Sequence, residues 1–236
     1  MAPPGPSGAA AALSYNLAPV APDATLDTLA CTDLACRRGN RLLFTGVNLE
    51  VRSGQAVWLR GRNGRGKTSL LRLAAGLAVP ESGKVSWGGV DVRRASVYAA
   101  VRVYIGHANA LKEDLTVLES LQFLARLHGR AHDRTSLGAA LERVGMASRR
   151  DAPVRTLSQG QRRRAALARL ALERNAALWI LDEPYDALDV DGIAAVNGLL
   201  HEHLARGGSV LLTSHLPPGA GAPDMAEFDL DRFAPR

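Results

Sequence analysis

The chain has 236 residues, 47% of them hydrophobic, and a formal net charge of +6. This length can bury the core of one α/β domain with a subdomain, and no apolar run reaches the ~20 residues that a membrane-spanning helix needs. We therefore expect a protein that is soluble or is attached to a membrane through a partner. The excess charge is almost entirely arginine, and Ala and Arg are abundant throughout, so we interpret it as a coding bias rather than a surface for nucleic acid or anionic lipid.

The N-terminal segment and the two cysteines carry no recognisable chemistry. Residues 1–22 are rich in Pro, Gly and Ala and lack the positive start of a signal peptide, so we predict a disordered leader over 1–22 and one domain over 23–236. Cys31 and Cys36 form neither a C-x-x-C pair nor a haem-attachment motif. We expect two buried thiols in a reducing cytosol.

Short strands and one helix are predicted in the first part of the domain. Two strands separated by a turn occupy 26–51, and a short buried strand occupies 55–60. A helix over 68–75 and short strands over 84–87 and 101–105 follow.

Helical periodicity dominates the middle of the chain. Helices are predicted over 116–128, 134–144 and 158–172, the first of them beginning with a capping box at Thr116. We expect an all-α insert over about 92–172.

The α/β pattern resumes after this insert. The run at 177–181 is continuously apolar, as in a buried parallel strand, and a helix over 189–206 and a strand over 209–213 follow it. An edge strand is predicted over 227–230.

The segment 61–68 matches G-x-x-x-x-G-K-[ST], the phosphate-binding loop. Glycines let its backbone wrap closely round a triphosphate, Lys67 would reach the β- and γ-phosphates, and the Thr68 hydroxyl would bind Mg²⁺. The helix predicted after the loop would place phosphate on a helix N-terminus. An accidental Gly-rich turn would match in about one per cent of chains of this size. We predict nucleotide binding by Gly61, Arg62, Asn63, Gly64, Arg65, Gly66, Lys67, Thr68 and Ser69.

Two carboxylates follow the apolar run that ends at Leu181. Asp182 stands where phosphate-loop proteins place a second Mg²⁺ ligand, and Glu183 could hold or deprotonate the attacking water. Solvated acids at a strand end are common in isolation, but beside a phosphate loop we favour a catalytic pair.

The segment 157–161, Leu-Ser-Gln-Gly-Gln, directly precedes an Arg-rich helical stretch at 162–170. Ser158 suits a helix N-cap, and Gly160 allows a close backbone approach. An N-cap alone would not indicate a function. The position of this segment shortly upstream of the acidic strand is what identifies it as a candidate motif.

Together these segments resemble an ABC-type ATPase. The resemblance covers about 28–215 and implies an α/β fold: a phosphate-loop NTPase core of the ABC ATPase type with an antiparallel β subdomain and an all-α helical insert. Its motifs, in the family's order and spacing, are 61–68, 157–161, 178–183, Ala187-Leu188-Asp189 and His215.

The family resemblance also implies roles for single residues. Lys67 and Thr68 would bind phosphate and Mg²⁺, and Asp182 would support the metal. Glu183 would polarise the water, and His215 would contact the γ-phosphate of ATP.

The resemblance further implies a head-to-tail dimer of two copies, with each ATP held between them. Ser158, Gly160 and Gln161 would complete the partner's site, and Asp189 would lie near the dimer seam.

Three features of the sequence depart from the family pattern. His107 stands where Gln is usual, and Gln159 stands where Gly is commoner. Arg37 and Arg38 occupy the region where an aromatic side chain usually stacks on adenine. Arg38 could stack its guanidinium on the base or could be a turn residue.

The segment 104–123 narrows the family. It resembles the ATP-binding subunit of the haem-exporter transporter of cytochrome c biogenesis, the CcmA type. In that type a Gly-His pair occupies the region of the usual Gln, and a lysine precedes a Leu-Thr-x-x-Glu helix start. Ala108 departs from that pattern, in which Gln follows the His. The resemblance implies an ATPase at the cytoplasmic face of the bacterial inner membrane, bound to separate integral membrane permease subunits. His107, with the surface up to Thr116, would pass ATP binding and hydrolysis to them.

Other functions stay open on this basis. The transported species could be haem, or the work could be release of a haem-loaded chaperone. The ATPase could serve another transporter, such as a multidrug exporter. A soluble ABC protein acting on ribosomes or DNA is disfavoured, because such proteins generally carry paired cassettes or a long coiled coil.

Overall fold

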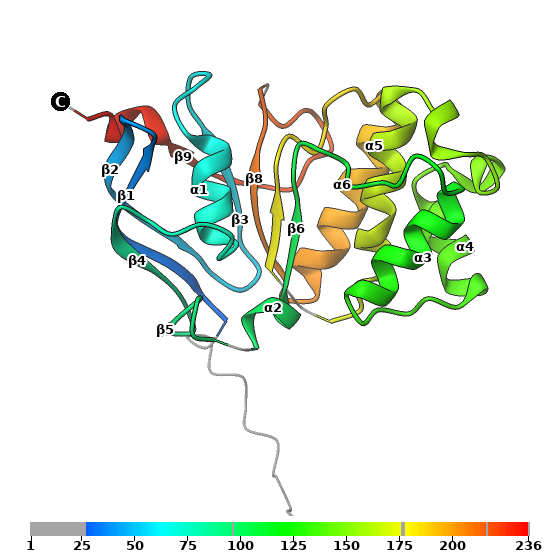
Figure 1. Cartoon of the computed structure of the whole chain (residues 1–236), viewed down its shortest axis with the longest axis horizontal. Coiled ribbons are helices and arrows are strands. Elements are labelled where there is room, and N and C mark those ends of the chain that lie inside the picture. The colour runs from blue at the N-terminus through cyan, green and yellow to red at the C-terminus, as the bar shows by residue number, and fades with distance from the viewer. Residues whose placement is uncertain (1–26, 96, 176–177, 216, 236) are drawn as a thin grey trace, which may run out of the picture.

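The computed structural model describes residues 27–95, 97–175, 178–215 and 217–235, so the predicted leader over 1–22 lies outside the described residues. Two β-sheets and a group of helices form the protein (Figure 1). The antiparallel sheet lies on one side of the parallel sheet, and most of the helices lie on the other.

The antiparallel sheet has the order β2-β1-β4-β5. β1 (Leu29–Arg38) and β2 (Arg41–Val51) form the hairpin predicted over 26–51, and Gly39 takes the positive φ of 57° that its tight turn requires. β4 (Ser82–Trp87) pairs with the other edge of β1, and β5 (Val90–Asp91) ends the sheet.

The parallel sheet has the order β6-β7-β8-β3-β9. Its strands are β3 (Ala56–Arg60), β6 (Arg102–Ile105), β7 (Leu178–Leu181), β8 (Ser209–Thr213) and β9 (Ala226–Asp229). Every neighbouring pair is parallel, and the last strand lies at the edge, as predicted. Because all the strands point the same way, their carboxyl ends meet at one edge of the sheet, where such folds bind ligands.

Two helices cover opposite faces of this sheet. α1 (Lys67–Ala74) packs between the two sheets, and α6 (Val190–Ala205) packs on the far face. Alternate side chains of β7 therefore enter two different hydrophobic cores, which explains why that strand is apolar at every position.

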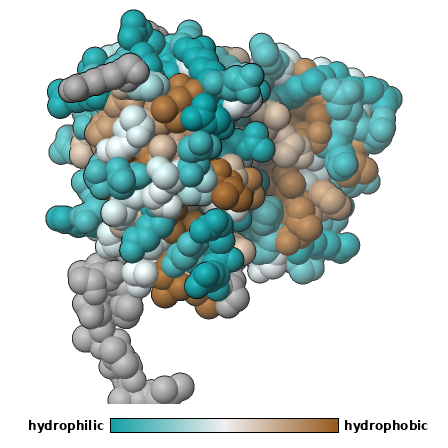
Figure 2. Space-filling model, turned by 60° about the vertical axis from the view of Figure 1, so that its left-hand side comes forward, coloured by the Kyte–Doolittle hydropathy of each residue, from teal (hydrophilic) through white to brown (hydrophobic). Residues whose placement is uncertain are grey.

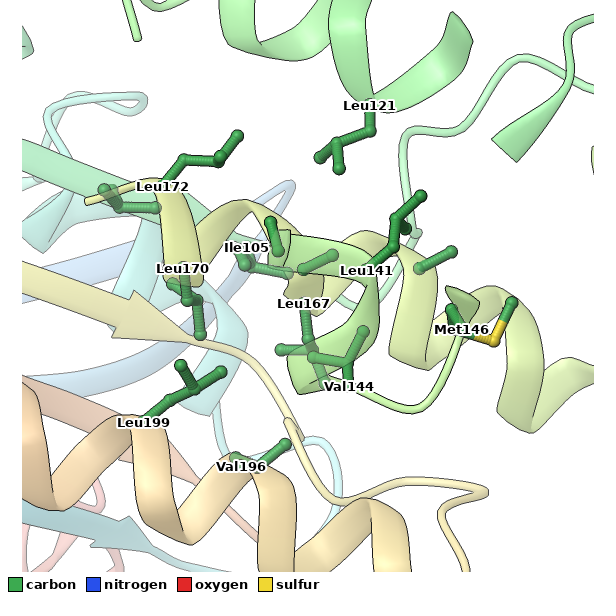
Figure 3. Close-up of a cluster of buried hydrophobic side chains, with 14 of the residues drawn as sticks. Ile105, Leu121, Leu141, Val144, Met146, Leu167, Leu170, Leu172, Val196 and Leu199 are labelled. Atoms are coloured by element: carbon green, nitrogen blue, oxygen red, sulfur yellow. The ribbon is translucent and has the colours of Figure 1, made fainter. Parts of the chain in front are cut away.

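Three further helices form a layer that shares a core with α6 and the parallel sheet (Figure 3). They are α3 (Val117–Leu127), α4 (Arg134–Arg143) and α5 (Gln159–Leu167). The capping box predicted at Thr116 is present. The helix predicted over 158–172 is shorter, because after Leu167 the chain tightens into the 3₁₀ helix Ala168–Leu172, a common way for a helix to end.

The helical layer begins later than the sequence suggested. Within the stretch expected to be all-α from Val92, β6 belongs to the parallel sheet. The short helix α2 (Tyr98–Val101) precedes it, and the buried Tyr98 hydroxyl donates to the carbonyl of Ala74, on the side of α1. β6 thus confirms the strand predicted over 101–105, and the all-α insert begins after that strand rather than at about 92.

The face shown in Figure 2 is mixed, with apolar patches separated by polar side chains. No described helix is both long enough and apolar enough to span a bilayer. The exposed large apolar side chains are Leu77, Val79, Val90, Val97, Phe123, Leu127 and Val190.

Candidate functional site

A cleft of about 460 Å³ opens at the carboxyl edge of the parallel sheet. It brings together residues that are far apart in the sequence. The phosphate loop contributes Arg62, Asn63, Gly64, Gly66, Lys67, Thr68 and Ser69, and the other walls are formed by Arg38, Arg41, Leu43, His107, Asp182, Glu183 and His215.

The phosphate loop connects β3 to α1, as predicted. Gly66 takes a φ of 108°, and a Cβ there would come within 3.1 Å of Leu43 and Phe44, so both the backbone and the packing require glycine. No described side chain caps the N-terminus of α1. Its first N–H groups therefore face the cleft without a side-chain acceptor, which suits an anion. Lys67 Nζ donates to the carbonyl oxygen of Gly61 at 2.7 Å, across the loop.

Asp231 holds the phosphate loop from the C-terminal segment, a contact that no sequence motif indicates. Its Oδ2 accepts the Arg62 N–H at 3.0 Å, and its Oδ1 accepts from Arg65 Nε at 2.7 Å. Burial alone would raise the pKa of Asp231, but the hydrogen bonds from Arg65 and Arg62 outweigh it, and the pKa lies below its ordinary value. The carboxyl is thus an anion at neutral pH, and Leu230, fully buried beside Gly61, anchors it.

Replacing Asp231 by Ala should raise the Kd for ATP about five- to tenfold, because the loop loses two charge-assisted contacts that fix its shape. Glu227→Ala is the matched control, since Glu227 lies on the same terminal segment and, among the described residues, its ion pair is with the exposed Arg60 of β3. Calorimetric titration of both variants with ATP checks this. Equal affinities in the two variants would contradict a role for Asp231.

The acidic pair follows β7, and Thr213 at the end of β8 fixes it. The Thr213 hydroxyl donates to Asp182 Oδ1 at 3.0 Å and accepts the Glu183 N–H at 2.9 Å. Asp182 is 2% exposed, and within the described part of the chain its Oδ2 has no hydrogen-bond partner. A buried carboxylate oxygen left without a donor is costly unless something else binds it.

Glu183 takes a φ of 52°, a conformation that side-chain-bearing residues rarely adopt. Its side chain is 10% exposed, and its Oε2 accepts the His215 N–H at 2.8 Å. His215 Nε2 lies 3.8 Å from Oε1. A carboxylate held at the cleft wall, with one oxygen tied to backbone, is suited to accept a proton from water.

His107 and Arg38 also lie where the sequence suggested. His107 lines the same cleft as the phosphate loop. Arg37 turns away and pairs with Glu81 at 3.0 Å, whereas Arg38 lines the cleft. Of these two arginines, Arg38 is therefore the one whose guanidinium is available to stack on an adenine base.

The residues predicted to complete a partner's site lie elsewhere in the single chain. Ser158 caps α5 and forms a capping box with Gln161. A Cβ on Gly160 would come within 2.4 Å of the Ala187 carbonyl oxygen, so this close approach requires glycine. Together with Asp189 they line a second cleft of about 410 Å³ that shares no residue with the first.

Magnesium fits the first cleft by the chemistry of its donors. The described residues contain no cluster of three or more His, Cys, Asp or Glu side chains that could hold a metal ion. Thr68 and Asp182 nevertheless line the same cleft, and Mg²⁺ is typically held by one or two protein oxygens together with substrate phosphates. The unpartnered Oδ2 of Asp182 is an acceptor that such an ion would satisfy.

Comparison with protein families and known proteins agrees with the resemblance found in the sequence. Residues 44–186 match the family model described as ABC transporter. A "Cytochrome c biogenesis ATP-binding export protein CcmA" of Methylococcus capsulatus is 50% identical over 189 residues, covering 79% of this chain and 90% of that protein. The protein of the same name from Nitrosomonas europaea is 44% identical over 191 residues, covering 80% and 89%.

Solved structures agree in fold. A putative ABC transporter ATP-binding protein from Pyrococcus furiosus superposes with a TM-score of 0.76 at 24% identity, covering 89% of this chain and 100% of that one. A structure described as the ATP-binding subunit of an ABC transporter gives a TM-score of 0.71 at 27% identity, covering 80% and 79%.

Proposed function

This chain belongs to the ABC transporter family and, within it, to the cytochrome c biogenesis ATP-binding export proteins, and we propose that it is the ATPase subunit of an export complex for c-type cytochrome assembly. The observation that carries this proposal is one cleft that joins the phosphate loop with Asp182, Glu183 and His215, in a chain half identical to such a protein.

Within one copy, the loop N–H groups and Lys67 bind the phosphates of ATP. Thr68 and Asp182 would hold Mg²⁺, which would neutralise charge on the phosphates. Glu183 orients the attacking water and accepts its proton. The backbone N–H of His215 keeps the Glu183 carboxylate aimed at the cleft. The His215 ring, which lines the same cleft, would contact the γ-phosphate.

ATP hydrolysis then needs a second copy. Ser158, Gly160 and Gln161 line a cleft separate from the phosphate loop, so a head-to-tail dimer would bring one copy's second cleft over the other's ATP. The N-terminus of α5 would add a further dipole directed at the γ-phosphate. Asp189, on the same cleft, would lie at the seam between the copies.

Arg38 is the proposed contact to the base. It stands in the region where the family usually places an aromatic side chain, and a guanidinium can stack on adenine in its place.

Besides a second copy of the chain, the proposed partners are integral membrane subunits. The relatives are named as export proteins, and we propose that this chain lies at the cytoplasmic face of the bacterial inner membrane, bound to integral permease subunits. The surface from His107 to Thr116 runs from the ATP cleft to the start of α3 and would carry the signal. The driven step is haem export or release of a haem-loaded chaperone.

A membrane pull-down tests the proposal. The tagged Glu183→Gln variant, incubated with ATP, should recover integral membrane subunits together with a haem chaperone. The Lys67→Ala variant, which should bind ATP poorly, serves as the control for ATP-dependent recovery. An unrelated permease would overturn the assignment to cytochrome c biogenesis. Ribosomes or DNA without a membrane protein would overturn the transporter assignment itself.

A further inference from the structure

Three consecutive arginines at the start of α5 have different surroundings. Arg162 pairs with the exposed Glu113 at 3.1 Å, and Arg164 pairs with Asp189. Arg163 between them is buried, with only 4% of its surface exposed. The sequence pattern alone does not distinguish the buried arginine from its two neighbours, so Arg163 was not among the expected functional residues.

The Arg163 guanidinium joins two strand ends at the wall of the ATP cleft. Its Nη1 donates to the Gly106 carbonyl at 2.9 Å and to Asn109 Oδ1 at 3.0 Å, on either side of His107 in the sequence. Its Nη2 donates to the carbonyl oxygens of Asp182 at 2.6 Å and Glu183 at 2.9 Å. One side chain on α5 therefore holds both the segment after β6 and the segment after β7.

Stability alone does not explain why the Arg163 guanidinium is buried. Burial lowers the pKa of the Arg163 guanidinium, and the nearby carboxylates of Asp182, Asp186 and Glu183 oppose that shift. No described carboxylate forms a salt bridge with it, and its Nε is buried with no hydrogen-bond partner among the described residues. A buried charge held by carbonyl oxygens is retained at a cost in desolvation. What it supplies instead is geometry, since its planar fork fixes several acceptors at once.

We propose that Arg163 is a positioning residue that couples the N-terminal part of α5 to the water-binding site. By holding the Glu183 carbonyl it maintains the left-handed backbone that aims the Glu183 carboxylate, and by holding Gly106 and Asn109 it keeps His107 at the same cleft. Any shift of α5, whose first residues would face the partner's ATP, is thereby transmitted to Glu183. The inference rests on the proposed function and adds to it the route between the two clefts.

Three variants test this coupling. Arg163→Gln keeps a donor but loses the fork, Arg163→Lys keeps the charge, and Arg162→Gln removes a neighbouring exposed arginine as the matched control. ATP turnover is measured in membranes that hold the full complex. Membranes with the Glu183→Gln variant give the background rate. ATP binding and thermal unfolding are measured on the purified full chain.

The expected result is a split between turnover and binding. Arg163→Gln should lower kcat about 20-fold or more, as misplaced catalytic groups do, while the Kd for ATP changes less than about threefold. Arg163→Lys should recover part of kcat, and Arg162→Gln should match the wild type.

Several outcomes would overturn the inference. A wild-type kcat in Arg163→Gln would do so, as would a fall in kcat that is matched by an equal loss of ATP-binding protein. If Arg163→Gln does not fold, Asn109→Ala removes a single acceptor, and it should still lower kcat with unchanged Kd. Wild-type membranes with no ATP turnover above the Glu183→Gln background would instead contradict the proposed function.

Discussion

Replacing Glu183 by Gln should lower ATP turnover about 10²- to 10³-fold and leave the Kd for ATP within about threefold of the wild type. Gln preserves the size of the side chain and can still accept the His215 N–H, so the cleft keeps its shape. It cannot take a proton from water. The loss therefore falls on the chemical step rather than on binding.

The same variant should trap ATP between two copies, because closure no longer ends in hydrolysis. Gel filtration with ATP and with ADP measures this, and a dimer is expected with ATP only. Glu202→Gln is the control, since Glu202 lies on the surface of α6 and pairs with Arg143. A monomeric Glu183→Gln protein that still hydrolyses ATP at the normal rate would remove Glu183 from the chemistry.

Replacing Asp182 by Asn should lower kcat/KM at millimolar Mg²⁺ about 100-fold, since it removes a charged ligand from the proposed metal site. Asn can still accept the hydrogen bond from Thr213, so the end of β7 should keep its place. The group that changes is the buried Oδ2, which has no partner among the described residues.

Mg²⁺ titrations of ATP turnover distinguish this effect from damage to the fold. The Asp182→Asn curve should shift to higher Mg²⁺, whereas the ATP affinity measured in EDTA should stay near that of the wild type. Asp186→Asn provides an acidic control, because Asp186 lies outside the ATP cleft. An unchanged Mg²⁺ dependence in Asp182→Asn would exclude Asp182 as a metal ligand.

The core of the site could be predicted from the sequence because its chemistry is local. The phosphate loop needs fixed glycines and a lysine within eight consecutive positions. Asp182 and Glu183 directly follow an apolar strand, and parallel strands all end at the same edge. The order of elements therefore sufficed to place these residues in one cleft.

Contacts between distant segments could not be predicted in this way. Asp231 reaches the phosphate loop only because β9 lies beside β3, and nothing in its own surroundings in the sequence indicates a partner. Arg163 differs from Arg162 and Arg164 only by the direction in which α5 turns it. The strand predicted over 101–105 is β6, but the all-α insert was expected to begin before it, at about 92, because a long helical region follows these four residues.

The most direct measurement for the central claim is the level of c-type cytochromes in the organism that encodes this chain. After deletion of the gene, covalently haem-stained c-type cytochromes should disappear while b-type haem spectra persist. The wild-type gene should restore them, and the Glu183→Gln gene, expressed at the same level, should not. Unchanged c-type cytochromes in the deletion strain would contradict the assignment to cytochrome c biogenesis.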